Sequence, residues 1–269
     1  MRKRLVSIAA ILSASVILLG LFGCSRPNRQ QVTLAGSTAF QPFAEKLAEH
    51  YLELNPQVQI NVQGGGSAVG IQSALSGAAE IGMADLIEIP PEAKELKATT
   101  VARDGVAIIV HPSNPTNNLT AEQDRAIFSG EITNWKDVGW HDAPIRVISR
   151  EEGSGTRRSF DRLVLKGNKL AAGALFQNSN GTCREAVASD PNAIGYVSIG
   201  LVNEKVRAVS YDGVHPTNED VKKGTYPLAR PVYFLTKGEP TPLAKAFIEY
   251  VLSPEAQDML EKEGLIPAK

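Results

Sequence analysis

The sequence predicts an α/β protein of two lobes, with helices on both faces of a largely parallel sheet and a ligand cleft between the lobes. Strand-like runs alternate with amphipathic helical runs along most of the chain, which is the pattern of βαβ units. A turn-rich break at residues 112–118 separates two such sets. Two extended runs, near residues 108–111 and 229–233, are expected to carry the chain from one lobe to the other and back.

The first set of elements lies between residues 31 and 110. Helical spacing of apolar residues, from Phe40 to Phe43, Leu47 and Tyr51, predicts a helix that ends at Asn55 and Pro56. The other runs are shorter and are assigned by alternation or by apolar content. Strands are expected at residues 31–35, 58–63, 80–84 and 100–110, and helices at residues 38–54 and 67–75.

The second set follows the break and leads to the C-terminal helices. Helices are expected at residues 121–129, 155–165, 184–189, 242–252 and 254–263, strands at residues 145–149 and 194–198, and an extended run at residues 227–235. Ser253 and Pro254 fit the N-cap and first position of the last helix. We expect the C-terminal helices to return to the first lobe, so that lobe 1 comprises residues 31–110 and 229–269 and lobe 2 comprises residues 111–228.

The N-terminal residues predict export. A basic start at residues 1–4 precedes an apolar run that is shorter than the roughly 20 residues of a spanning helix. Leu21-Phe22-Gly23-Cys24 then resembles the bacterial lipobox, in which the cysteine is lipidated and the signal is cut before it. We expect a signal peptide over residues 1–23, a lipid on Cys24, a tether over residues 24–30 and an extracytoplasmic location on the cell membrane. The alternative is a plain N-terminal membrane helix.

Composition excludes several classes of function. The net charge of −1 leaves no electrostatic footprint for nucleic acid. With Cys24 lipidated, Cys183 has no cysteine to pair with, so the fold is expected to hold without a disulfide. The four histidines are scattered singly, outside any metal-ligand spacing. We therefore expect no metal and no cofactor.

Three segments share one design, in which a strand ends in small or hydroxyl residues and a helix begins. They are Ala35-Gly36-Ser37-Thr38-Ala39, Gly64-Gly65-Gly66-Ser67 and Gly153-Ser154-Gly155-Thr156. The first N–H groups of a helix lack intrahelical partners, and such a terminus suits an anion. Each segment alone is as well explained by ordinary capping. Three of them at the carboxyl ends of strands favour a binding site.

Arg150 follows one of these strands and supplies a full positive charge. A guanidinium matches a tetrahedral oxyanion with paired donors. Glu152 is expected to hold Arg150 in place, and the alternative for Arg150 is a surface residue in a local ion pair.

Asp85 ends the apolar strand Ile81-Gly82-Met83-Ala84, so it also lies at a carboxyl strand end. A carboxylate in an anion site is useful if the ligand carries a proton, because an ionised carboxylate only accepts. Phosphate near neutral pH has such a proton and sulfate does not. A site built on this hydrogen bond would reject sulfate strongly. The alternative is that Asp85 caps the following turn.

These motifs together resemble the phosphate-binding proteins of the bacterial high-affinity phosphate ABC importer (PstS type), within the periplasmic-binding-protein superfamily. The resemblance covers nearly all of the mature chain. It includes the segments above and two more, Ile127-Phe128-Ser129-Gly130-Glu131-Ile132-Thr133-Asn134-Trp135 and Ala193-Ile194-Gly195-Tyr196. It implies a type II two-lobed fold, each lobe a mixed sheet flanked by helices.

The resemblance also implies roles for individual residues. Asp85 would accept the phosphate proton and Arg150 would give paired donors. The remaining donors would be Thr38, the Ala39 amide, Ser67, Ser154, Gly155 and Thr156. The family role is non-enzymatic capture of inorganic phosphate by a monomer, which delivers it to the membrane permease subunits of the importer.

Other functions stay open at this point. One alternative is a binding protein for another oxyanion, such as sulfate, molybdate or a phosphonate. A phosphate sensor or adhesin is a further alternative. A secreted phosphate-ester hydrolase is disfavoured, because no Ser-His-Asp constellation is visible and Gly153-Ser154-Gly155 is not a Gly-x-Ser-x-Gly elbow.

Overall fold

The computed structural model describes residues 30–268. The expected signal peptide, Cys24 and the tether up to residue 29 lie outside these residues. The strands are β1 (Gln31–Gly36), β2 (Gln59–Gln63), β3 (Ile81–Asp85), β4 (Leu96–Val110), β5 (Asn118–Leu119), β6 (Arg146–Arg150), β7 (Leu175–Gln177), β8 (Ala193–Ser198), β9 (Arg207–Tyr211), β10 (Ala229–Lys237) and β11 (Ile266–Pro267). The helices are α2 (Gln41–Leu54), α3 (Ser67–Ser76), α4 (Ala121–Ser129), α5 (Gly155–Phe160), α6 (Asn180–Ala188), α7 (Asn218–Lys223), α8 (Pro242–Val251) and α9 (Pro254–Lys262).

The strands form one continuous sheet, whose main path is β2-β1-β3-β10-β4-β8-β6-β7. Strand β1 is parallel to β2 and β3, and β6 is parallel to β7 and β8. Strand β10 is antiparallel to both β3 and β4. The sheet is therefore mixed, as the family resemblance implied, rather than largely parallel. Its antiparallel centre arises because the chain leaves the first half along β4 and returns along β10, in the opposite direction.

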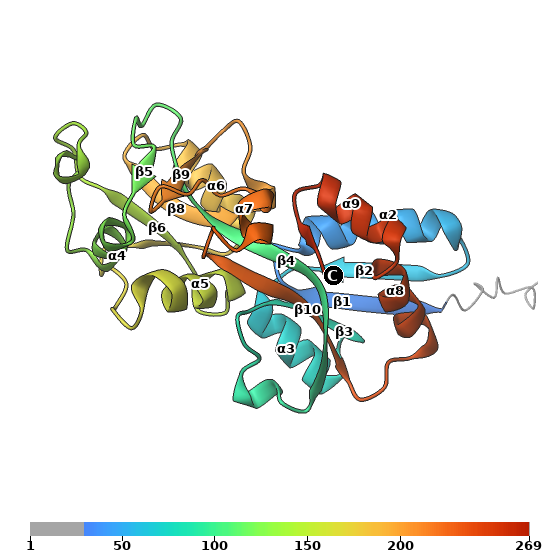
Figure 1. The fold of residues 1–269 in the computed structure, drawn as a ribbon. Helices are drawn as coiled ribbons and strands as arrows, with labels where there is room; N and C mark the ends of the chain where they lie inside the picture. The colour runs from blue at the N-terminus through green and yellow to red at the C-terminus, as the bar shows by residue number, and fades with distance from the viewer. Residues whose placement is uncertain (1–29, 269) are drawn as a thin grey trace, which may run out of the picture. The chain divides into compact units, whose positions relative to one another are not determined.

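Two hydrophobic cores lie on either side of this centre. The first core is built from β1, β2, β3, α2, α8 and α9, and we call these elements and α3 lobe 1. The second core is built from α4, α5, β6, β8, β9 and α7, and we call these elements with α6 and β7 lobe 2. Figure 1 shows β4 and β10 side by side between the two groups of helices.

Strand β4 serves both lobes. Its residues Val101 and Ala102 belong to the first core, whereas Val106, Ile108 and Val110 belong to the second, where they pair with β8. The crossing on β4 thus lies at Asp104 and Gly105, earlier than the predicted 108–111. Residues 106–110, which were assigned to lobe 1, pack in lobe 2. The physical reason is that a single long strand can extend from one core into the next without a turn.

The C-terminal helices return to lobe 1. Leu243, Phe247 and Val251 of α8 and Leu260 of α9 are buried in the first core, beside Phe43 and Leu47 of α2. Helix α3 packs into a separate apolar cluster with Leu235 of β10. Figure 1 shows α2, α8 and α9 on one side of the lobe 1 strands and α3 on the other.

Local signals explain most element ends. Ser253 caps α9 by accepting from the Ala256 amide, and Pro254 is its first residue, as predicted. Helix α2 begins at Gln41 rather than at residue 38, because residues 38–40 form a turn. Helix α6 begins at Asn180 rather than at residue 184, because Ser179 and Thr182 form a capping box. The segment at residues 155–165 is helical throughout and changes to a π-helix at Asp161.

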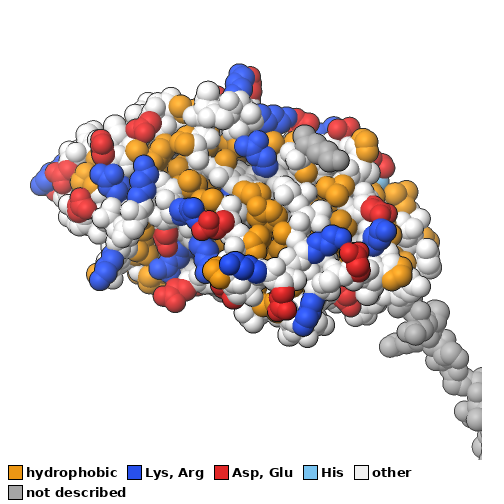
Figure 2. Space-filling view, turned by 60° about the horizontal axis from the view of Figure 1, so that its bottom comes forward, with side chains coloured by type: hydrophobic (Ala, Val, Ile, Leu, Met, Phe, Trp, Pro, Cys, Tyr) orange, Lys and Arg blue, Asp and Glu red, His pale blue; other side chains and the backbone are white. Residues whose placement is uncertain are grey.

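The surface carries charges of both signs. Figure 2 shows Lys and Arg side chains interspersed with Asp and Glu side chains over the face that is drawn. Within residues 30–268, no helix combines the length and the apolar character needed to cross a membrane.

Candidate functional site

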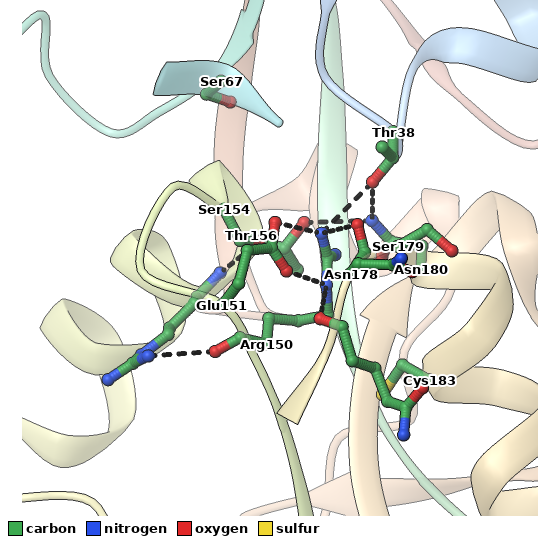
Figure 3. A network of polar contacts seen from close by, with 12 residues as sticks. Thr38, Ser67, Arg150, Glu151, Ser154, Thr156, Asn178, Ser179, Asn180 and Cys183 are labelled. Carbon is green, nitrogen blue, oxygen red and sulfur yellow. Dashed lines mark hydrogen bonds and ion pairs between the residues drawn. The ribbon is translucent and has the colours of Figure 1, made fainter. Parts of the chain in front are cut away.

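The predicted site residues come together where the two lobes meet. The ends of β1, β2 and β3 place Thr38, Ser67 and Asp85 at one edge of lobe 1, and the end of β6 places Arg150 opposite them. Figure 3 shows Thr38, Arg150, Asn180 and Thr156 within one network of polar contacts. Side chains from distant parts of the chain are therefore joined by hydrogen bonds across the two lobes.

Asp85 is buried and joins the two lobes. Its Oδ1 accepts a hydrogen bond from Ser67 Oγ at 3.0 Å, within lobe 1. Its Oδ2 accepts one from Thr156 Oγ1 at 3.1 Å, across the interface. The Asp85 amide donates to Ser67 Oγ at 3.2 Å. Asp85 is therefore a member of the network, because both of its carboxylate oxygens accept hydrogen bonds within it.

Arg150 is 1% exposed and is held along one edge of its guanidinium. Its Nε lies 3.0 Å from Glu151 Oε2 and its Nη2 lies 2.9 Å from Glu151 Oε1, which forms a two-pronged ion pair. Nε also donates to the Gln177 carbonyl at 3.1 Å, and Nη2 to Thr38 Oγ1 at 3.2 Å. Within the described residues, Nη1 has no partner. The Nη1 group of this buried guanidinium is thus available to donate hydrogen bonds to a ligand.

The predicted partner of Arg150 needs correction. Glu151 holds the guanidinium, whereas Glu152 is exposed on the turn that follows β6. Glu151 can reach Arg150 because the turn directs it back over the end of the strand, where its amide donates to the Gln177 carbonyl.

Thr38, in the turn between β1 and α2, has a hydroxyl hydrogen that is free to donate. Thr38 Oγ1 accepts from Arg150 Nη2 at 3.2 Å and from Asn180 Nδ2 at 3.4 Å, so its own hydrogen is left to donate. The Ala39 amide, a predicted ligand donor, donates to Ser37 Oγ at 3.2 Å in this structure. Ser37 also accepts from the Phe40 amide and so fixes the turn before α2.

The hydroxyl groups of Ser67, Thr156 and Ser154 differ in their hydrogen bonds. Ser67 Oγ and Thr156 Oγ1 both give their hydrogen to Asp85. Thr156 Oγ1 also accepts from Asn180 Nδ2 at 3.3 Å. Ser154 is the N-cap of α5 and accepts from the Arg157 amide at 3.2 Å, which leaves its hydroxyl hydrogen to donate.

Gly155 is the point of closest approach between the lobes. A Cβ atom at this position would lie 2.1 Å from Ser67 Oγ and 2.5 Å from the Asp85 carbonyl oxygen. Nearby, the Ala68 amide donates to the Gly153 carbonyl at 3.0 Å, so the two backbones are bonded across the interface. Glycine is needed here because any side chain would separate the lobes.

Four residues in this network were missed by sequence reasoning, namely Asp104, Glu151, Asn180 and Arg230. Asp104 follows Arg103 inside one strand run, and Arg230 is a charge within another that is largely apolar; a charge in such a run was a signal that could have indicated them. Burial raises the pKa of Asp104 to about 6, although Arg230 and a hydrogen bond from Ser198 oppose this rise. Asn180 was missed because its helix was expected to begin later.

Cys183 lies near this network, as Figure 3 shows, but its thiol points to a core carbonyl group. Its thiol is fully buried and contacts the Tyr196 carbonyl oxygen at 3.4 Å. Burial raises the pKa of this thiol to about 11, so it is protonated and unreactive near neutral pH. Cys183 is a core residue of lobe 2.

The arrangement suits an oxyanion that also has a hydroxyl group. Arg150 Nη1, Thr38 and Ser154 offer donors, and Asp85 offers an acceptor. Among residues 30–268, no group of three or more His, Cys, Asp or Glu side chains could hold a metal ion.

Comparison with known proteins connects this geometry with a family. Residues 25–255 match the family model described as a PBP superfamily domain. The chain is 36% identical over 241 residues to the phosphate-binding protein PstS of Bacillus subtilis (strain 168), covering 88% of this chain and 80% of that protein.

The chain is also similar to solved structures of phosphate-transport binding proteins. The chain superimposes with a TM-score of 0.86 and 41% identity on a Clostridium perfringens protein assigned as a phosphate ABC transporter substrate-binding protein and solved with bound phosphate. That match covers 89% of this chain and all 100% of the other. An ABC-type phosphate transport receptor from Vibrio cholerae matches with a TM-score of 0.73 and 37% identity, over 87% of this chain and 99% of the receptor.

Proposed function

We propose that this chain, which belongs to the PBP superfamily and within it to the PstS phosphate-binding proteins, captures inorganic phosphate between its two lobes. Phosphate would bridge Thr38, Ser67 and Asp85 of lobe 1 and Arg150, Ser154, Gly155 and Thr156 of lobe 2. Closure of the lobes about β4 and β10 would then bury it. The bound phosphate is proposed to pass to the membrane subunits of an ABC importer.

The observation that carries this proposal is a buried cation and a buried carboxylate in one hydrogen-bond network that joins the two lobes. Arg150 and Asp85 are 1% and 2% exposed. They are connected through Thr38, Asn180 and Thr156 by successive hydrogen bonds of 3.1–3.4 Å. A buried anion must have its hydrogen-bonding groups satisfied. Phosphate fits because its oxygens accept from Arg150 while its hydroxyl donates to Asp85.

The proposed location of the protein follows from its N-terminal sequence. The protein is proposed to be a non-enzymatic monomer, anchored by a lipid on Cys24 to the outer face of the cell membrane. The sequence Leu21-Phe22-Gly23-Cys24 supports the anchor. Labelling of cells with a radioactive fatty acid would test it, because Cys24→Ser should abolish incorporation into the protein.

Isothermal titration calorimetry tests the ligand. The purified protein, stripped of bound anion, is titrated with phosphate and then with sulfate. Tight one-to-one binding of phosphate with little response to sulfate is expected. Asp85→Asn should reduce the preference for phosphate, because the amide can donate to sulfate. A preference of the wild type for sulfate, molybdate or a phosphonate would keep the fold and replace the ligand.

A further inference from the structure

A second buried arginine lies beside the candidate site. Arg230 is on β10, and its side chain is 0% exposed. Its Nη2 lies 2.8 Å from Asp85 Oδ2, 2.9 Å from Asp104 Oδ2 and 3.3 Å from Thr156 Oγ1. Within residues 30–268, its Nε and Nη1 have no partner. One nitrogen therefore makes all the polar contacts of this guanidinium.

Asp104 fixes the position of Arg230. The two residues are opposite each other in the antiparallel pairing of β10 with β4. Asp104 Oδ1 accepts from Ser198 Oγ at 2.8 Å, and its Oδ2 faces Arg230. Both strands cross between the lobes, so this ion pair lies where the two cores join. Its place is thus set by backbone register and not by a flexible loop.

The two carboxylate oxygens of Asp85 differ in their contacts. Each carboxylate oxygen has two acceptor positions. Oδ2 accepts a hydrogen bond from Thr156 Oγ1 and also lies 2.8 Å from Arg230 Nη2 in an ion pair. Oδ1 accepts one hydrogen bond, from Ser67 Oγ. The oxygen with room for a ligand hydroxyl is therefore Oδ1.

We propose that Arg230 is the positioning residue for anion selectivity: it holds Asp85 by Oδ2, so that Oδ1 of the ionised carboxylate receives the hydroxyl hydrogen of the ligand. This inference rests on the proposed capture of phosphate. Arg230 also balances the charge of Asp85, which otherwise would face an anion inside a buried site. Without Arg230, Oδ2 would lose its ion pair and Oδ1 would no longer be directed at the hydroxyl group of the ligand. Phosphate would then lose a hydrogen bond that sulfate cannot make, so the preference for phosphate would fall.

The geometry also predicts which substitution preserves the function. Because a single nitrogen makes the contacts, an ammonium group with three donors can replace it. Arg230→Lys should therefore retain most of the selectivity, whereas Arg230→Met, which keeps the bulk of the side chain without its charge, should lose it. Arg103→Met is the matched control, since Arg103 is exposed on β4 next to Asp104.

The experiment measures the ratio of the sulfate and phosphate dissociation constants by calorimetry on the full-length protein and its variants. Arg230→Met is expected to lower this ratio about tenfold or more, with Arg230→Lys and Arg103→Met near the wild type. A purely structural role for Arg230 would change stability and both affinities together and would leave the ratio unmoved.

The outcomes separate the two proposals. If wild type does not bind phosphate, the proposed function falls and this inference falls with it. If wild type binds phosphate and Arg230→Met keeps the wild-type ratio, only this inference is overturned. If Arg230→Met does not fold, Asp104→Asn decides, because it releases Arg230 from β4. A lowered ratio in Asp104→Asn supports the inference, and an unchanged ratio contradicts it.

Discussion

Arg150 and Arg230 are both buried guanidinium groups in one hydrogen-bond network, yet their surroundings differ. Arg150 is paired with one carboxylate, Glu151, whose side chain is 31% exposed. Arg230 is paired with two carboxylates, Asp85 and Asp104, which are almost fully buried. Arg150 keeps Nη1 open in a region where hydroxyl groups from both lobes converge.

The difference shows that residue type and burial do not define a ligand residue. A guanidinium beside one partly solvated carboxylate has positive charge available for an incoming anion. A guanidinium between two buried carboxylates has its charge already balanced, and its role is to hold them. We therefore expect Arg150 to bind the ligand and Arg230 to act through Asp85.

The strongest test of this contrast is Arg150→Ala. It should weaken phosphate binding by about 3 kcal/mol or more, on the order of 100-fold, because a charged hydrogen bond is lost and Glu151 is left unpaired. Calorimetry measures the affinity. The matched control is Arg146→Ala, since Arg146 lies on the same strand with a side chain that is 56% exposed. Equal affinities of the two variants would show that Arg150 is structural.

A second test changes Gly155, where the two lobes approach each other most closely. Gly155→Ala would place a methyl group against Ser67 and the Asp85 carbonyl. Keeping the lobes apart should cost about 1–3 kcal/mol of binding free energy. The affinity for phosphate should fall accordingly, while small-angle scattering shows a more open protein in the presence of phosphate.

Gly173→Ala is the control for this change, because a Cβ atom at Gly173 meets nothing within 4 Å. Wild-type affinity in Gly155→Ala would mean that the lobes can bind phosphate without the close approach seen here.

A third test uses a buried carboxylate that has no guanidinium. Asp124 is 0% exposed, and within the described residues neither of its carboxylate oxygens has a hydrogen-bond partner. Burial, and secondly the charge of Asp212, raise its pKa well above the ordinary value. The folded state therefore binds a proton that the unfolded state has released. Stability should be highest below the ordinary carboxyl pKa of about 4 and fall as the pH rises toward the folded-state pKa.

Asp124→Asn should remove this dependence. Urea unfolding at about pH 5 and about pH 8 should show the variant gaining roughly 1 kcal/mol or more relative to wild type at the higher pH. The exposed Asp137→Asn is the control. Asp104→Asn should gain less than Asp124→Asn between these two pH values, because Arg230 and the hydrogen bond from Ser198 oppose the rise of the Asp104 pKa. Equal gains in Asp104→Asn and Asp124→Asn would remove the distinction between paired and unpaired buried carboxylates.

The smallest effect is expected for an exposed arginine between the lobes. Arg162 pairs with Glu88, and both side chains are more than half exposed, at 53% and 66%. Arg162→Ala should change phosphate affinity by less than about 1 kcal/mol, and the difference should vanish in high salt. Titrations at low and high ionic strength measure this. A loss of phosphate affinity that persists in high salt would mean that Arg162 contributes to binding directly, as Arg150 is expected to do.

Sequence reasoning found the parts of the site whose signal is local. Thr38, Ser67 and Ser154 belong to short turns between a strand and a helix, and Asp85 and Arg150 end strands. It chose Glu152 over Glu151 because the direction of a turn side chain depends on backbone geometry. It missed Arg230, since the contacts of this residue join positions 126 and 74 residues apart in the chain.

The α/β elements, the hydroxyl-rich turns and the charged strand ends can all be recognised in the amino-acid sequence. These features follow from periodicity, capping and side-chain chemistry, which act over a few neighbouring residues. Three further features depend on long-range contacts: β4 and β10 run antiparallel between the cores, Gly155 approaches Ser67 and Asp85, and both Arg230 and Thr156 contact one oxygen of Asp85. The physical reason is that these contacts depend on strand register and lobe packing, which bring together residues far apart in the chain.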